Sequence, residues 1–335
     1  MRDSGWLHLR HLRARLRTLS CITLCIATIW AGPVAAIDCG AIPNSRLSTQ
    51  EQVTNFQAFY GPCDSVVGDL IIEYADISDL TGLAGLNSVS GSLLLYYTTS
   101  LPNLTGLEGL TGVGDLYIEA ARLLTSLDGL QNLVSIDGLH ILRNANLPNL
   151  VGLPSTLASV SNLEISGNPM MSDLEGIPAI GEITRSVHIS RNDKLANIEA
   201  LGSSGFPASD TPQVDVTISQ NPLLASLSGL PAIDKIGSLA ITENTMLTSL
   251  SGLESLVEIW DGLVVINSPA LRDCSALTTV LDAVDDGAVG PSTDPGEPPD
   301  SPGLAFILME GNHDGCNSIK EILDGLILDD GFENP

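Results

Sequence analysis

Basic, aromatic and histidine residues are scarce in this sequence. Of 335 residues, 14 are Lys or Arg against 40 Asp or Glu, aromatic residues make up 4%, and five are histidines. Five of the bases and one of the acids precede residue 37, which leaves nine bases and 39 acids, a net charge of −30, in the rest of the chain. Such a charge repels nucleic acid and anionic membrane surfaces, so we expect neither as a partner.

Long apolar runs are also missing after residue 36, so we predict no transmembrane segment in the mature chain. Before that point, a basic stretch (2–17) precedes a short apolar run (20–30) and small residues that end at Ala36. This order is typical of a secretory signal peptide, here residues 1–36. We therefore expect an exported protein, located outside the cell, on its surface or in the periplasm.

A repeat of 23 or 24 residues organises residues 67–281. Each copy carries an apolar-x-apolar signature and then a comb of leucines that contains a glycine. Alternating apolar residues predict a strand with one face buried, and copies that all run the same way must stack as a parallel sheet. We therefore predict a mainly β, parallel β-solenoid of nine to ten coils. Its nine strand anchors are Leu70/Ile72, Leu93/Leu95, Leu116/Ile118, Leu139/Ile141, Leu163/Ile165, Val187/Ile189, Val216/Ile218, Leu239/Ile241 and Leu263/Val265.

Asparagine recurs three residues after the second strand anchor. An inward Asn at a bend bonds backbone groups of stacked coils, so these residues predict a structural ladder; a row of ligand-binding amides is the alternative. The predicted ladder consists of Asn144, Asn168, Asn192, Asn221, Asn244 and Asn312.

Short helical caps are expected at both ends of the solenoid, because an open end exposes apolar surface. In the N-terminal cap (37–66), hydroxyl residues at 48–49 predict a helix start, with Val53, Phe56 and Phe59 on one buried face. At the C-terminal end (304–323), Ile307, Met309 and Asn312 repeat the coil pattern, and a closing helix buries Ile319, Ile322 and Leu323.

Four cysteines follow the signal peptide, two near each end. Eight or more coils of ~4.8 Å separate the ends by ~40 Å, whereas a disulfide needs Cα atoms within about 7 Å. We therefore predict the pairs Cys39–Cys63 and Cys274–Cys316, which suit an oxidising compartment.

Two further segments lack the repeat. Residues 282–303 are rich in Pro, Gly and acids and predict a disordered insert, with a calcium site as the alternative. The acidic tail (324–335) contains Asp-Gly-Phe-Glu, which resembles the short tails of some secreted bacterial proteins. It is interpreted either as a sorting signal or as a frayed end.

The Cys-containing cap, the segment VVGDLIIE (66–73) and the leucine comb resemble the receptor L-domain and its leucine-rich-repeat-like relatives. The resemblance covers about residues 39–316. It implies a right-handed parallel solenoid with extracellular recognition roles and brings no catalytic residues with it. The chain departs from a plain leucine-rich repeat because no helical segment follows each strand.

Catalytic patterns are absent: there is no G-x-S-x-G, H-E-x-x-H or P-loop motif. His140 and His188 occupy the same outward position two coils apart, about 10 Å, which is too far to share a metal. Parallel β-helix polysaccharide lyases are the enzyme alternative, but Arg143 and Arg191 face no acid cluster in the repeat. We therefore predict a protein that is not an enzyme and has no metal or cofactor.

Tyrosines gather in the first three strands, and exposed aromatic residues on a rigid sheet suit sugar stacking or a protein contact. We predict that the chain recognises a protein or carbohydrate through this sheet face. A structural or adhesive envelope protein without a discrete site is the alternative. The candidate ligand-binding residues are Tyr96, Tyr117, Tyr74, Tyr97 and His140.

Overall fold

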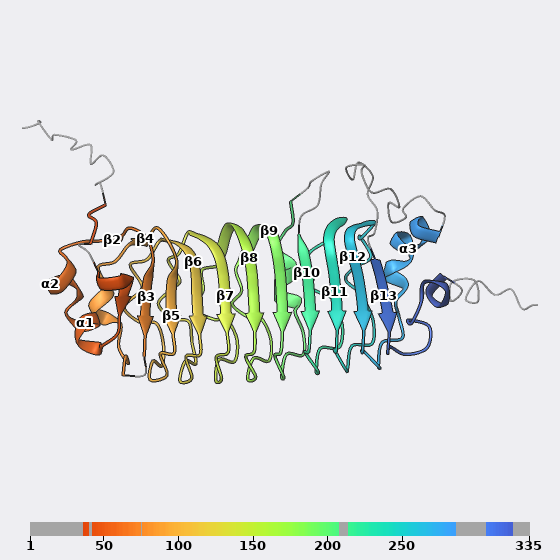
Figure 1. Ribbon diagram of the computed structural model, residues 1–335, viewed down its shortest axis with the longest axis horizontal. Coiled ribbons are helices and arrows are strands. Elements are labelled where there is room, and N and C mark those ends of the chain that lie inside the picture. The colour runs from red at the N-terminus through yellow and green to blue at the C-terminus, as the bar shows by residue number, and fades with distance from the viewer. Residues whose placement is uncertain (1–35, 40–41, 75, 208–213, 286–305, 324–335) are drawn as a thin grey trace, which may run out of the picture. The chain divides into compact units, whose positions relative to one another are not determined.

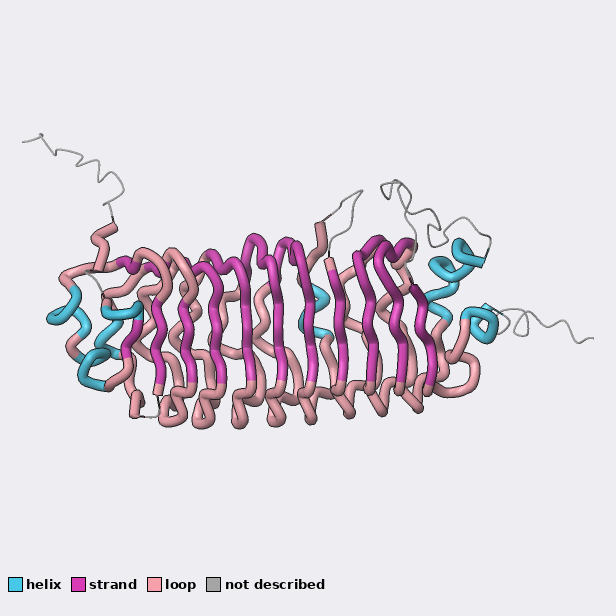
Figure 2. Tube along the Cα trace, in the orientation of Figure 1, coloured by secondary structure: helices cyan, strands magenta, loops and turns pink. Residues whose placement is uncertain are grey.

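The alternating Leu and Ile residues form strands of one parallel sheet, which winds into a β-solenoid of about nine turns (Figure 1). This computed structural model describes residues 36–39, 42–74, 76–207, 214–285 and 306–323. Figure 2 shows the strands side by side along one face, with loops at the corners and helices mainly at the two ends. The predicted mainly β, parallel solenoid is confirmed.

The elements follow the repeat. The strands are β1 (Arg46–Leu47), β2 (Ser65–Val66), β3 (Leu70–Glu73), β4 (Ser88–Val89), β5 (Leu93–Tyr96), β6 (Gly112–Glu119), β7 (Ser135–Leu142), β8 (Thr156–Ser166), β9 (Ala179–Ser190), β10 (Asp215–Ser219), β11 (Lys235–Thr242), β12 (Glu258–Ile266) and β13 (Phe306–Glu310). The labelled helices are α1 (Gln50–Thr54), α2 (Phe56–Tyr60) and α3 (Thr278–Asp285), with short 3₁₀ turns η1 (Pro43–Ser45), η2 (Thr81–Leu83), η3 (Glu199–Ser203) and η4 (Ser275–Leu277). Residues 319–323 are also helical, as expected for the closing helix, with Ile322 buried and Ile319 and Leu323 partly buried against the core.

The core is a set of stacked apolar columns. Register places Leu70 on Leu93 and Leu93 on Leu116, and the same pairing continues to Ile307 in β13. Each of the 18 anchor residues of the nine repeats is at most 3% exposed. Burying a Leu or Ile side chain stabilises the fold by about 1.5–3 kcal/mol relative to leaving it exposed. Because these side chains pack against the coils on either side, every coil is stabilised by its neighbours rather than by a separate core.

A ladder of buried side-chain amides joins the coils at the ends of the strands from β7 onward. The Asn168 Oδ1 accepts the backbone N–H of Asn144 at 3.0 Å, and its Nδ2 donates to the carbonyl of Ile141 at 2.9 Å. The same bonds recur at Asn144, Asn192, Asn221 and Asn244, each of which is 0% exposed. The ladder continues through Ser268 to Asn312.

The N-terminal cap covers the first coil. Thr49 caps α1, and its side chain and Gln52 form a reciprocal capping box. Val53 and Phe56 are fully buried, but Phe59 is 53% exposed. The expected burial of Phe59 is wrong because the chain leaves helical geometry at Asn55 (φ −101°, ψ 24°), which divides the predicted helix into α1 and α2 and turns Phe59 outward.

The C-terminal end contains one helix that the repeat did not predict. After Leu277 the chain forms α3 (Thr278–Asp285), which buries Val280 and Leu281. Its last residues, 282–285, begin the segment expected to be disordered, and that expectation is wrong for these four; residues 286–303 lie outside the described residues, as does the tail 324–335. β13 then pairs in parallel with β12, as the spacing of Ile307 and Met309 predicts.

Both expected disulfides are present. Cys39 and Cys63 join the N-terminal cap, with Cα atoms 4.8 Å apart, and Cys274 and Cys316 join the C-terminal end, with Cα atoms 5.8 Å apart. The second bridge spans 42 residues and ties the last coil to the chain that follows β12.

We predict that Asn168→Ala lowers the free energy of unfolding by about 2–3 kcal/mol, because it leaves a buried N–H and a buried carbonyl without partners. Urea unfolding followed by circular dichroism measures this. Asn146→Ala is the matched control: Asn146 lies at the same corner but is exposed, with one bond to the Arg122 carbonyl. Equal losses in the two variants would contradict the structural role of the ladder.

Candidate functional site

The residue directly before each ladder position has left-handed backbone geometry. Ten such residues, one per coil, have φ between 53° and 90°. This geometry costs a non-glycine residue about 1–2 kcal/mol, and here it turns the chain so that the next side chain enters the ladder. The ten residues are Tyr74, Tyr97, Ala120, Arg143, Gly167, Arg191, Gln220, Glu243, Asn267 and Gly311. We call them the corner column.

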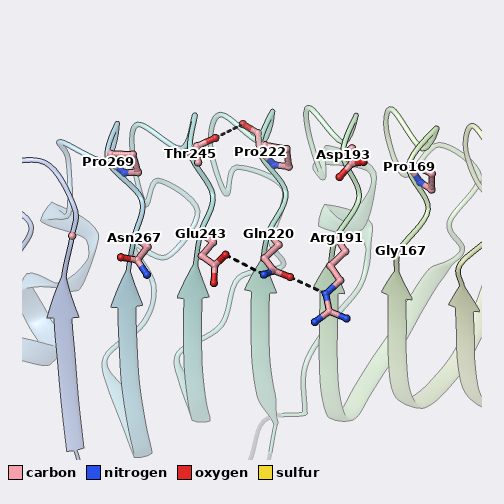
Figure 3. Close-up of a pocket in the computed structure, with 11 residues that line it drawn as sticks. Gly167, Pro169, Arg191, Asp193, Gln220, Pro222, Glu243, Thr245, Asn267 and Pro269 are labelled. Atoms are coloured by element: carbon pink, nitrogen blue, oxygen red, sulfur yellow. Dashed lines mark hydrogen bonds between the residues drawn. The ribbon is translucent and has the colours of Figure 1, made fainter.

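An open groove follows the corner column over the last six of these coils (Figure 3). Its volume is about 930 Å³, and six coils at ~4.8 Å extend over about 24 Å. One side consists of corner-column residues and the other of residues two positions later in each coil. The lining residues are Gly167, Arg191, Gln220, Glu243, Asn267 and Gly311, opposite Pro169, Asp193, Pro222, Thr245 and Pro269.

Side-chain hydrogen bonds along the column hold the polar groups of the groove in place. The Arg191 Nε–H donates to Gln220 Oε1 at 2.8 Å, and Gln220 Nε2 donates to Glu243 Oε2 at 3.0 Å (Figure 3). Arg191 and Gln220 are 29 residues apart in sequence, yet they occupy neighbouring coils. The groove therefore presents an ordered row of a guanidinium, an amide and a carboxylate.

The opposite side of the groove is stiff. Pro169, Pro222 and Pro269 have a fixed φ, and the Thr245 hydroxyl donates to the Pro222 carbonyl at 3.3 Å. Because these residues lose little freedom when a ligand binds, the entropic cost of binding is low. At both ends of the groove a glycine, Gly167 or Gly311, leaves the corner column without a side chain.

The predicted tyrosines occupy two different rows. Tyr74 and Tyr97 are consecutive corner-column residues and are about half exposed. Tyr96 lies in the row that contains Glu73 and Glu119, and its ring contacts that of Tyr97 edge-on, with centroids 4.4 Å apart. Tyr74 and Tyr97 therefore form the aromatic end of the same corner that carries the groove.

Tyr117 and His140 belong to the outward row of the sheet. Their rings stack with centroids 4.1 Å apart and planes 5° from parallel, and His140 is only 8% exposed. His140 thus supports the Tyr117 ring and exposes little of its own surface. Gly138 makes this possible, because a Cβ there would lie 2.8 Å from the His140 Nε2.

Glu164 lies between the two histidines in this row. Register pairs it with His140 on one side and His188 on the other, and its Oε2 is 3.0 Å from the His140 Nδ1. The His140 hydrogen bond is the main reason why the pKa of Glu164 lies below its ordinary value. Partial burial opposes this effect, and the charges of His140, His188 and Arg143 add to it.

Arg143 is not isolated, contrary to expectation. Its guanidinium pairs with the largely buried carboxylate of Glu119 in the preceding coil. The alignment of the repeats did not predict this pair, because the two residues occupy different positions in their coils. Arg143 is a corner-column residue, whereas Glu119 lies one residue before the corner-column residue of the preceding coil. Arg46 of the cap forms a similar ion pair with Glu73, at 3.0 Å.

The described residues include no group of three or more His, Cys, Asp or Glu placed to hold a metal ion. None of the helices in this part of the chain is long and apolar enough to cross a membrane. The comparisons found no family model, curated protein or solved structure that matches this chain.

The groove residues had a signal in the sequence that the repeat analysis did not use. Each of them precedes a ladder position or follows it by one residue, so the Asn column itself marks them. The tyrosines were predicted as the ligand-binding residues instead, because aromatic residues are scarce in this sequence and several of them gather in the first strands.

We predict that Glu164→Gln lowers the melting temperature at pH 7 and that this deficit shrinks in acid. A carboxylate with a lowered folded pKa contributes its stability above its ordinary value of 4.5, and that contribution is lost as the pH falls through the folded value. Thermal unfolding at pH 7 to pH 3 measures it. Glu182→Gln, exposed on β9, is the control; a pH-independent deficit for Glu164→Gln would refute the prediction.

Proposed function

We propose that this chain is an exported, non-enzymatic recognition protein that binds a linear glycan along the corner groove. The observation that carries the proposal is the open groove of about 930 Å³ over six coils, lined by pre-positioned polar side chains. A stack of coils repeats its chemistry at a constant interval, which suits a polymer that also repeats.

The groove lining favours a glycan over a peptide. Sugar hydroxyls both donate and accept hydrogen bonds, and the lining supplies both kinds of partner in Arg191, Gln220, Asn267 and Glu243. Protein interfaces depend instead on large aromatic or aliphatic anchors, whereas the apolar side chains that line the groove belong to Pro169, Pro222 and Pro269.

Export is supported by the N-terminal pattern of residues 1–36 and by the two disulfides, which persist in oxidising compartments. The unit that contains the solenoid starts at Ile37, directly after the expected cleavage point. A relationship to the receptor L-domain remains part of this proposal, supported by the cap, the VVGDLIIE segment and the leucine comb.

A protein partner is the second candidate. Met170, Leu223 and Met246 are exposed by 41–53%, and each directly follows a residue that lines the groove. Exposed apolar side chains in one row suit a protein contact. In that case cross-linking on intact cells would capture a protein through this row, and no oligosaccharide would bind the groove.

We predict that Asn267→Tyr reduces binding of any oligosaccharide found by glycan-array screening by about tenfold or more. Tyrosine is compatible with this backbone, because Tyr97 occupies the same column position at φ 53° and Asn267 has φ 56°. The ring fills the groove beside Gly311, which has no side chain. Calorimetric titration measures the affinity.

Val257→Tyr is the matched control for this experiment. Val257 precedes β12 in the same coil, at the opposite end of the strand, and is 47% exposed. Retained binding in Asn267→Tyr, or equal loss in both variants, would refute binding in the groove. An array with no hit for the wild-type protein would direct attention to the protein partner or to a structural role.

We further predict that the double variant Tyr74→Ala and Tyr97→Ala weakens binding of long oligosaccharides more than of short ones. These two rings lie on the same corner column but beyond the groove, and only a long chain reaches them for stacking on their faces. Phe59→Ala, an exposed aromatic on α2, is the control. Equal effects on both chain lengths would show that the tyrosines do not contact the glycan.

A further inference from the structure

Positive charge is concentrated in one coil of this acidic protein. Arg185, Arg191 and Lys194 fall within ten residues of β9 and its following corner, and they are three of the nine Lys and Arg residues after residue 36. Only Arg191 of these three lines the groove.

The guanidinium of Arg191 has N–H donors that bind no other group within the described residues. Arg46, Arg143 and Lys235 each form an ion pair with a carboxylate, but within the described residues Arg191 forms none. Its Nε–H is the one side-chain donor bonded within the described residues, to Gln220, and that bond fixes the plane of the guanidinium. The terminal nitrogens therefore remain available in a fork that matches a carboxylate.

The position next to Arg191 along the groove is open. Gly167 precedes Arg191 in the corner column and has no side chain, and a Cβ there would lie 3.2 Å from the Arg143 Cγ. The space above Gly167 is thus bounded by the stem of Arg143 on one side and by Arg191 on the other. Arg191 is the positive charge that an anionic group in this space would meet, because the Arg143 guanidinium is already paired with Glu119.

The other charges of the groove limit how many acidic groups a ligand can carry. Glu243 lies two coils from Arg191 towards the C-terminal end, and Asp193 lies across the groove from Arg191 in the same coil. Both repel a second anionic group, as does the net charge of −30 after residue 36. A densely charged polyanion is therefore excluded, whereas a glycan with a single acid near Gly167 fits.

We infer that the groove binds a sparsely carboxylated oligosaccharide, with the carboxylate of one uronic acid residue over Gly167 and paired with Arg191. This inference rests on the proposed glycan binding and assigns the class of glycan. The neutral sugars that follow the acid extend along Gln220 and Asn267.

The test uses gluco-, xylo- and galacto-oligosaccharides, each in a neutral form and in a form with one uronic acid residue, titrated into the mature protein. We expect the acidic form of the bound series to bind about tenfold more tightly than its neutral form. In Arg191→Gln the two forms should bind alike. Arg185→Gln, the same charge change on an exposed residue of the same coil, should keep the preference.

The outcomes distinguish a failure of this inference from a failure of the proposed function. If neutral and acidic forms bind the wild-type protein equally and Asn267→Tyr blocks both, the groove binds glycans but the role of Arg191 is refuted. If Arg185→Gln removes the preference as fully as Arg191→Gln, general charge and not the Arg191 fork is responsible. If no member of the panel binds, both the inference and glycan binding in the groove are rejected.

Discussion

The buried amide ladder is the interaction on which the rest of this structure depends. At each strand end the chain must turn sharply, and the turn leaves backbone N–H and C=O groups inside the solenoid. The side chain of Asn168 or Asn192 satisfies one donor and one acceptor of the preceding coil at once. Few other side chains carry both functions on one short, planar group. Without them, the coils from Asn144 onward would contain unpaired polar groups.

The ladder also determines what the surface can do. To direct each Asn inward, the residue before it takes a left-handed conformation, and its side chain then lies on the outer corner. Because the position recurs in every coil, its side chains form a continuous line, aromatic at Tyr74 and Tyr97 and polar from Arg191 to Asn267. A structural requirement inside the solenoid thus produces an ordered surface outside it.

Charged side chains are distributed unevenly along this line. The chain as a whole is strongly acidic, yet Arg143 and Arg191 lie on either side of Gly167, and Glu243 lies further along the groove. Glu164, between His140 and His188, shows the same local balance on the neighbouring sheet face. In an acidic protein such basic side chains discriminate among ligands. The net negative charge repels an anionic ligand unless each of its acidic groups pairs with a basic side chain.

The sequence by itself determined the solenoid, the inward columns and the positions of the ladder, because burial imposes a period of two within strands and one repeat length between coils. It also determined the disulfide pairs, since the two ends lie too far apart to be bridged. Only the tertiary structure decided which outward residues meet. Arg191 and Gln220 become neighbours across a 29-residue step, Glu164 lies between two histidines, and Phe59 turns outward at a kink. Outward side chains have no burial pattern of their own. The ladder positions mark where the left-handed corners lie, but which corner side chains meet follows from the register of the stacked coils.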